Sequence, residues 1–223
     1  MQKELKIITI DGPGGAGKGT IAAMLSQKYG LFLLDSGALY RILALHVMQL
    51  GHNITDEKQV YHDAKNIKIS FKQENSKVIS YLNGVDVSIK IRNEDCAKNA
   101  SIIAGYKTIR EILLQKQRDF ASPPGVVADG RDMGSVVFSQ AKYKIFITAT
   151  IMVRAKRRQK QLQNQGENVN IVSLCKQIEE RDYRDKNRAV SPLKPATDAF
   201  IIDTSAMTIK EVFKKAQNFI EAK

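Results

Sequence analysis

The sequence predicts an α/β fold, in which a central parallel β-sheet lies between two layers of helices and carries a small antiparallel β insertion. Short apolar runs alternate with amphipathic helical segments along most of the chain, which is typical of a sheet buried on both faces. A glycine-rich loop separates the first such run from the first helical segment. The 223 residues, 43% of them hydrophobic, are enough for one domain with a full core.

The elements can be placed from the spacing of apolar residues. Five short apolar runs predict parallel strands at 7–10, 31–34, 125–128, 143–148 and 200–202. Three segments with helical spacing predict helices at 20–29, 37–50 and 208–222. Gly30 follows the first of these helices, in the position where glycine ends a helix.

The middle of the chain interrupts this alternation. Residues 67–71 and 78–87 are predicted to form antiparallel strands. Asn83-Gly84 within the second segment is typical of a type I′ turn, because both residues tolerate a positive φ. We therefore expect a small β insertion in the α/β domain.

Composition excludes several classes of protein. No segment has the ~20 consecutive apolar residues that a membrane-spanning helix needs. Cys96 and Cys175 lie far apart and have no ligand-spaced partner, so neither a zinc site nor a disulfide framework is expected. We expect a cytoplasmic protein. The net charge of +12 favours an anionic partner. Charge alone does not distinguish nucleic acid, a membrane surface and a phosphorylated small molecule.

The clearest motif is the glycine-rich loop, which fits G-x-x-x-x-G-K between a strand and a helix. Its residues are Gly12, Pro13, Gly14, Gly15, Ala16, Gly17, Lys18, Gly19 and Thr20. Such a loop curls so that backbone N–H groups and the helix N-terminus face phosphate oxygens, while the lysine spans the β and γ phosphates. We therefore expect a nucleoside triphosphate to bind here. Gly19 stands where Ser or Thr usually ligates Mg²⁺, so direct ligation by the chain is not expected.

Three further motifs accompany this loop: 34–41 (LDSGALYR), 129–134 (DGRDMG) and 180–188 (ERDYRDKNR). Together with Gly-Lys-Gly-Thr, they resemble the bacterial cytidylate kinases, members of the nucleoside monophosphate kinases. The resemblance extends along nearly the whole chain and implies the three-layer P-loop NTPase fold. It also implies reversible transfer of a phosphoryl group from MgATP to CMP or dCMP. The implied regions are a core (about 1–36, 120–153 and 196–223), a monophosphate-binding region with the β insertion (about 37–119) and a lid (about 154–195).

The resemblance assigns a set of CMP-binding residues. They are Ser36, Tyr40, Arg41, Ser101, Arg110, Gly130, Arg131, Asp132, Arg181, Asp185 and Arg188. Within this set, it places Arg41 and Arg131 on the phosphate, with Arg188 joining on closure. It places Ser101, Arg110 and Asp132 on the cytosine, and Arg181 and Asp185 at the pentose.

The residue types support part of this assignment. Arginine holds phosphate oxygens in a planar fork and stays charged, and Arg131 follows a strand at the edge where ligands bind in open α/β sheets. Other interpretations remain open at this point. Arg41 can be a surface residue, Ser101 can be a helix N-cap, and residues 181–188 can form a solvated helix face.

The catalytic set is predicted to be Lys18, Arg131, Arg188 and Asp129. Asp129 ends an apolar strand. The Walker B acid of P-loop proteins, which orients Mg²⁺ through water, has the same position. Thr20 is the other candidate for a water-mediated contact with the ion. Arg157 is predicted to bind ATP, with Arg158 as a second candidate, although ordinary helix charges are an equal alternative.

No covalent intermediate is expected, because the CMP phosphate is already ionised and acts as the nucleophile. The expected partners are ATP and CMP or dCMP, with no nucleic acid, no membrane and a monomeric chain. Two alternatives stay open. A sibling kinase that uses UMP or AMP would share the loop and the arginines, and a nucleic-acid-binding P-loop ATPase would need a continuous basic surface with stacking aromatics.

Overall fold

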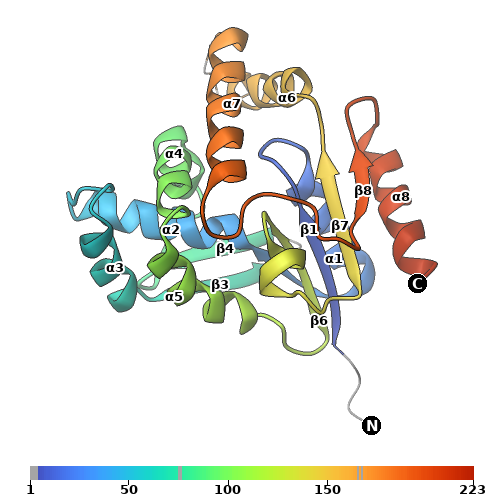
Figure 1. The fold of residues 1–223 in the computed structure, drawn as a ribbon, viewed down its shortest axis with the longest axis horizontal. Helices are drawn as coiled ribbons and strands as arrows, with labels where there is room; N and C mark the ends of the chain where they lie inside the picture. The colour runs from blue at the N-terminus through green and yellow to red at the C-terminus, as the bar shows by residue number, and fades with distance from the viewer. Residues whose placement is uncertain (1–4, 75–76, 165, 167) are drawn as a thin grey trace.

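The computed structural model describes residues 5–74, 77–164, 166 and 168–223 (Figure 1). Its main sheet has five strands in the order β2-β6-β1-β7-β8, and every neighbouring pair is parallel. The strands are β1 (Lys6–Asp11), β2 (Phe32–Asp35), β6 (Gly125–Gly130), β7 (Tyr143–Thr148) and β8 (Phe200–Asp203). All five predicted parallel strands are confirmed, and so is the α/β class.

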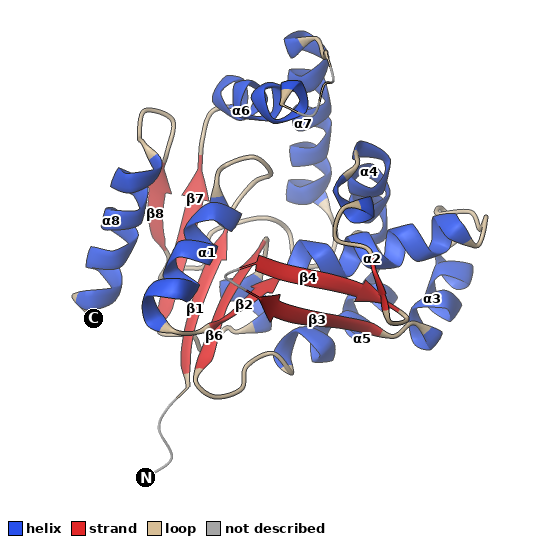
Figure 2. Ribbon diagram, turned by 180° about the vertical axis from the view of Figure 1, so that it is seen from behind, coloured by secondary structure: helices blue, strands red, loops and turns tan. Residues whose placement is uncertain are grey.

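Helices cover both faces of this sheet (Figures 1 and 2). On one face lie α1 (Lys18–Tyr29) and α8 (Ile209–Glu221), which share a core with Val127 of β6. On the other lie α2 (Ser36–Gln49) and α5 (Lys107–Arg118). They pack with Val126 and Ala128, whose side chains point away from Val127 because successive strand residues face opposite sides.

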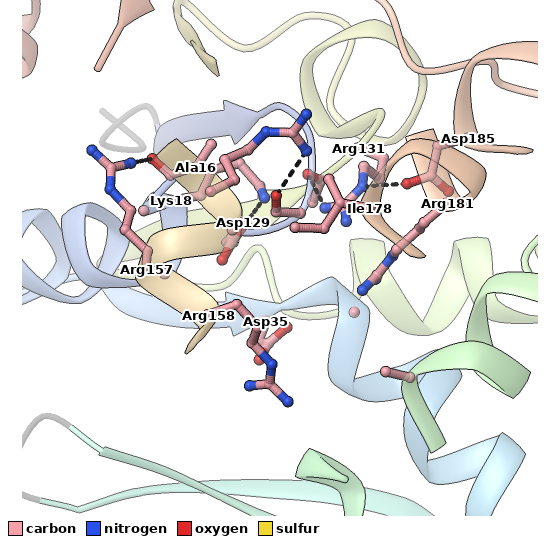
Figure 3. Close-up of a pocket in the computed structure, with 18 of the residues that line it drawn as sticks. Ala16, Lys18, Asp35, Asp129, Arg131, Arg157, Arg158, Ile178, Arg181 and Asp185 are labelled. Carbon is pink, nitrogen blue, oxygen red and sulfur yellow. Dashed lines mark hydrogen bonds and ion pairs between the residues drawn. The ribbon is translucent and has the colours of Figure 1, made fainter. Parts of the chain in front are cut away.

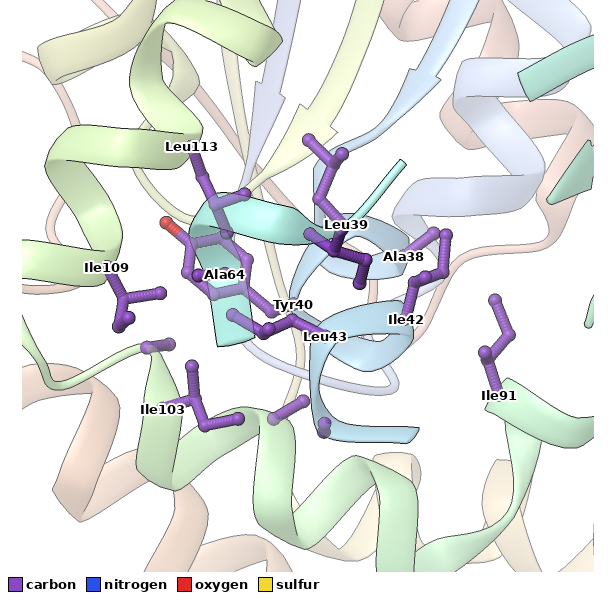
Figure 4. Close-up of a cluster of buried hydrophobic side chains, with 14 of the residues drawn as sticks. Ala38, Leu39, Tyr40, Ile42, Leu43, Ala64, Ile91, Ile103, Ile109 and Leu113 are labelled. Carbon is purple, nitrogen blue, oxygen red and sulfur yellow. The ribbon is translucent and has the colours of Figure 1, made fainter. Parts of the chain in front are cut away.

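The second core is built largely from α2 (Figure 4). Leu39, Ile42 and Leu43 are almost completely buried, and they pack in one cluster with Ile109 and Leu113 of α5. This apolar face fixes α2 against the sheet. The start of α2, at Ser36, is thereby held at the carboxyl end of β2.

The β insertion is present as a separate three-stranded antiparallel sheet. Its strands are β3 (Ile69–Glu74), β4 (Lys77–Leu82) and β5 (Val85–Asp86). Asn83 and Gly84 have φ values of 50° and 84°, which confirms the predicted turn, so the segment 78–87 contains two strands around it. Before this sheet comes α3 (Glu57–Asn66), capped by Asp56, a helix that the sequence analysis did not identify.

Five more elements complete the described chain. They are η1 (Lys90–Arg92), α4 (Glu94–Ile103), the π-helical turn η2 (Met133–Val137), α6 (Ile151–Gln163) and α7 (Ile171–Asn187). The pair α6 and α7 rises above the carboxyl ends of the strands and has its own small core around Leu162 and Leu174 (Figure 1). Among the described residues, no helix is both long and apolar enough to cross a membrane.

Candidate active site

A cavity of about 1100 Å³ opens at the carboxyl ends of the strands, between the glycine loop, α4, α6 and α7 (Figure 3). All the predicted site residues line it except Gly12 and Pro13. These residues come from segments spread over the whole chain. The parallel sheet brings them together because its strands all end at the same edge.

The glycine loop has a backbone that only glycine permits at its first position. Gly12 has φ +145°, and a Cβ there would lie 1.9 Å from the carbonyl oxygen of Ile147. Gly17, with φ 94°, is the N-cap of α1, so the first turn of this helix faces the cavity. Its N–H groups and its positive end therefore point to where a phosphate would lie.

Lys18 is buried at the floor of this loop. Its Nζ donates to the Pro13 carbonyl oxygen at 3.1 Å and lies 3.6 Å from Oδ1 of Asp129. Burial, together with nearby Arg131, lowers the pKa of Lys18 to about 8, against the opposing effect of Asp129. Burial also raises the pKa of Asp129, against the opposing effect of Lys18. A buried ammonium group in this position is suited to hold an anion.

Arg131, which follows β6, and Arg181 of α7 lie near each other in the cavity (Figure 3) and close to Gly14. A Cβ at this glycine would lie 3.3 Å from Nη2 of Arg131 and 3.6 Å from Nη1 of Arg181. Arg131 Nε donates to Asp185 Oδ2 at 2.9 Å, whereas the buried Nε of Arg181 has no partner. Burial and Arg131 lower the pKa of Arg181 to about 10. Burial alone would raise the pKa of Asp185, but the two arginines lower it.

Asp132 is the centre of a second cluster, next to these arginines. Arg110 forms an ion pair with it through Nη2, and Nη2 of Arg188 lies 3.8 Å from its Oδ1. The hydroxyl of Tyr40, Nε of Arg110 and Nη2 of Arg188 are buried without a hydrogen-bond partner. Burial raises the pKa of Tyr40 to about 12, so its hydroxyl is a donor at neutral pH. Unpaired buried groups of this kind are costly unless a ligand satisfies them.

Two serines lie nearby. Ser101 is in the last turns of α4 and is not an N-cap; its Oγ accepts from Nε of Arg184 at 3.4 Å. Ser36 begins α2 and accepts a hydrogen bond of 2.7 Å from Nε2 of Gln117. Both serines are buried. The role of Gln117 was missed because no motif or spacing marks it in the sequence.

Other cationic side chains of the cavity hold its walls together. Arg41 Nη1 donates to the Ile91 carbonyl oxygen at 2.9 Å. Arg157 Nη1 donates to the carbonyl oxygen of Ala16 in the glycine loop at 3.2 Å, and its Nη2 donates to the Thr204 carbonyl oxygen at 2.8 Å. The interpretation of Arg157 as an ordinary exposed helix charge is therefore wrong. Arg158 Nε donates to Glu94 of α4 across the cavity at 2.7 Å.

The residues 181–188 do not form the solvated face considered above. Asp182 and Asp185 are buried, Arg181 lines the cavity, and α7 ends at Asn187, which makes Arg188 its C-cap. Arg188 Nε donates to the Ser191 carbonyl oxygen at 2.5 Å. In the described part of the chain, no group of three or more His, Cys, Asp or Glu side chains is arranged to hold a metal ion.

Comparison with known proteins agrees with this geometry. The family model described as cytidylate kinase matches residues 8–222. A cytidylate kinase of Aliivibrio salmonicida is 49% identical over 217 residues, which cover 97% of each chain. Cytidylate kinase 1 of Haemophilus influenzae is 47% identical over 96% of this chain and 93% of its own, and a cytidylate kinase of Vibrio cholerae is 46% identical over 100% and 99%. The match extends along almost the whole chain and agrees with the glycine loop and the arginine cluster of the cavity. The chain therefore belongs to the cytidylate kinase family.

Proposed function

We propose that this enzyme transfers the γ-phosphoryl group of ATP to CMP or dCMP and forms ADP and CDP or dCDP reversibly. The observation that carries the choice of base is the cluster around Asp132. Cytosine presents an amino donor at N4 and acceptors at N3 and O2. The Asp132 carboxylate can accept from N4, while the unpaired donor on Arg110 can serve an acceptor. Uracil has a carbonyl at that position and would face the carboxylate with another acceptor.

The phosphate groups of the two substrates would meet above Gly14. Lys18 and the N-terminus of α1 bind the triphosphate from one side, and Arg41, Arg131 and Arg188 bind the CMP phosphate from the other. Two polyanions repel each other, so these cations lower the barrier by positioning and charge neutralisation. No general base is required, because the attacking phosphate oxygen is already ionised at pH 7. The helices α6 and α7 cover this region and would exclude water.

Mg²⁺ fits the chemistry of the donor set beside the loop. Asp129 has one carboxylate oxygen 3.3 Å from the position of a Cβ on Gly19, and the hydroxyl of Thr20 is exposed to the cavity in the same turn. One carboxylate and one hydroxyl suit an ion that keeps several of its waters. We assign Asp129 and Thr20 to that hydration shell. When bound with ATP, the ion neutralises charge on the β and γ phosphate oxygens.

The expected partners remain ATP and CMP or dCMP, without nucleic acid or membrane. Four arginines that the site needs for phosphate and pentose, Arg41, Arg131, Arg181 and Arg188, line one cavity. This supports a small phosphorylated substrate over an extended polyanion. We propose a monomeric enzyme, and the two free cysteine thiols support a cytoplasmic location.

The test is ADP formation from MgATP with CMP, dCMP, UMP, AMP, GMP and no acceptor. CMP and dCMP should exceed the other acceptors. Asp132→Ala should lower kcat/KM for CMP about 10- to 150-fold, the effect expected from losing a buried hydrogen bond to a charged group, and should alter any residual use of UMP far less. Asp119→Ala, at an exposed carboxylate after α5, is the control. If kcat/KM fell equally for CMP and UMP, Asp132 would have no role in base recognition. If the rate of ATP hydrolysis were the same with every acceptor and with none, the proposed kinase activity would be refuted.

A further inference from the structure

Arg154 is the arginine of α6 that lies deepest in the structure. It is 3% exposed, and each of its three guanidinium nitrogens is bonded to a protein group. Nε donates to the Ala149 carbonyl oxygen at 3.0 Å, and Nη1 donates to the Gly14 carbonyl oxygen at 3.1 Å. Nη1 and Nη2 also hold both carboxylate oxygens of Asp182, at 3.0 and 2.5 Å. The forked geometry leaves this side chain little capacity for a phosphate.

The partner of Arg154, Asp182, belongs to α7, the helix that also carries the proposed CMP-binding residues Arg181 and Asp185. Asp182 and Asp185 are three residues apart on α7 and so lie on one side of the helix. The first holds Arg154, which also contacts the glycine loop, and the second holds Arg131 after β6. Two carboxylates one turn apart therefore attach α7 to two arginines that flank Gly14.

The contact with the loop is close as well as polar. A Cβ at Gly15 would lie 3.3 Å from Cβ of Arg154, so the stem of the arginine packs directly on the loop backbone. A shift of the loop would therefore move Arg154, and through Asp182 it would move α7. Arg181 is the neighbour of Asp182 in this helix, and its guanidinium points toward Gly14.

We infer that Arg154 and Asp182 are positioning residues, which set α7 against the glycine loop so that Arg181 and Asp185 are presented to the CMP side of the cavity. The pair couples the ATP-binding loop to the CMP-binding helix and touches neither substrate. This inference rests on the proposed function, since it assigns a role within the same site.

A double-mutant cycle tests the inference. Arg154→Lys keeps the charge but cannot form the forked bond, and Asp182→Asn keeps the shape but removes the charge. Each variant should raise the KM for CMP about tenfold, and the double variant should be no worse, because both changes remove one interaction. The Kd for MgATP without CMP should change by no more than about twofold in either variant, since neither residue touches the nucleotide.

Three controls make the result decisive. The first control is turnover of CMP by the wild type. If it were absent, the proposed function would be refuted. If it is present, the double-mutant cycle tests only the role of Arg154 and Asp182. Asp198→Asn makes the same change at a more exposed carboxylate, which is paired with Lys144 at 3.0 Å. Neither residue of that pair lines the cavity, so the KM for CMP should not change. Unfolding midpoints are recorded for every variant.

Two results would overturn the inference. If Arg154→Lys lost affinity for ATP and Asp182→Asn did not, Arg154 would be a phosphate ligand. A lowered unfolding midpoint with an unchanged KM for CMP would make the pair merely structural. If a single variant fails to fold, Arg154→Met with Asp182→Leu removes both buried charges together. That variant should fold and still show the raised KM for CMP, and a normal KM would refute the positioning role.

Discussion

Lys18 shows at the residue scale how burial prepares a side chain for its ligand. The folded protein holds its ammonium group among Arg131, Arg181 and Asp129, and lowers its pKa from 10.5 to about 8. Because the folded-state pKa is below the unfolded value, the charged lysine costs stability at neutral pH. This cost is relieved as the pH rises from 8 toward 10.5. A bound triphosphate would remove it by supplying negative charge.

The expected consequence is proton uptake on ATP binding. Near pH 8 about half of the free enzyme carries a neutral Lys18, and the phosphates favour the charged form, so binding should take up about half a proton. At pH 6 the lysine is already charged and the uptake should vanish. Titration calorimetry in buffers of different ionisation enthalpy measures this quantity. Lys18→Met should abolish both the uptake and phosphoryl transfer; uptake that persists in this variant would assign the proton to another group.

At the scale of elements, the end of β1 is bonded to the turn that follows β6. Asp11 accepts hydrogen bonds from the backbone N–H groups of Met133 and Gly134, at 2.8 and 2.7 Å. Arg131 and Asp132, which line the cavity and are proposed to bind CMP, come just before this turn, so the carboxylate of Asp11 fixes them without lining the cavity itself. Burial raises the pKa of Asp11 to about 7, although the two hydrogen bonds oppose the shift.

Asp11→Asn should lower the free energy of unfolding by about 1–3 kcal/mol, because one buried N–H then faces an amide donor. The KM for CMP should rise more than that for ATP. The pH dependence provides a control. Since the folded-state pKa exceeds the unfolded value of 3.8, Asp11 makes the wild type lose stability as the pH rises from 4 to 7. Denaturant titrations should show this slope reduced in the variant, and an equal slope in both proteins would refute the raised pKa.

The same elements show how far the sequence can predict the structure. The five strands, the glycine loop and the β4–β5 turn were predicted because each depends on neighbouring residues. The partner of Asp11 lies 122 residues away, that of Gln117 lies 81 away, and that of Arg154 lies 28 away. Such contacts exist only after the sheet has formed, so no local pattern reports them. The resemblance named residues that line the cavity, but their bonds to one another required the fold.

At the scale of the whole molecule, the cavity joins regions that otherwise touch little. Its walls are α4 on one side, which contributes Glu94 and Ser101, and α6 and α7 on the other, which contribute arginines. Across it, Arg158 is paired with Glu94, and Arg184 with Ser101. The buried guanidinium of Arg181, which lies close to Arg131, is unfavourable in this arrangement until anionic substrates are present. The stability of the molecule should therefore depend strongly on its ligands.

Each substrate should stabilise the protein against heat. A ligand present at 100 times its Kd adds about 2.7 kcal/mol, which for a chain of this size raises the unfolding midpoint by about 5–10 °C. CMP with a non-hydrolysable ATP analogue should raise it by at least the sum of the separate shifts. Differential scanning fluorimetry measures these midpoints, with UMP in place of CMP as the control. A combined shift smaller than either single shift would contradict binding at adjoining sites.

The turn at Asn83-Gly84 also provides an attachment point for reagents. Of the described residues of the insertion sheet, Val78 of β4 lines the cavity. Asn83 follows it by five residues, or about 17 Å of extended strand. The turn is exposed. A fluorophore or surface tether joined there would report on the enzyme, or immobilise it, with the cavity facing the solution.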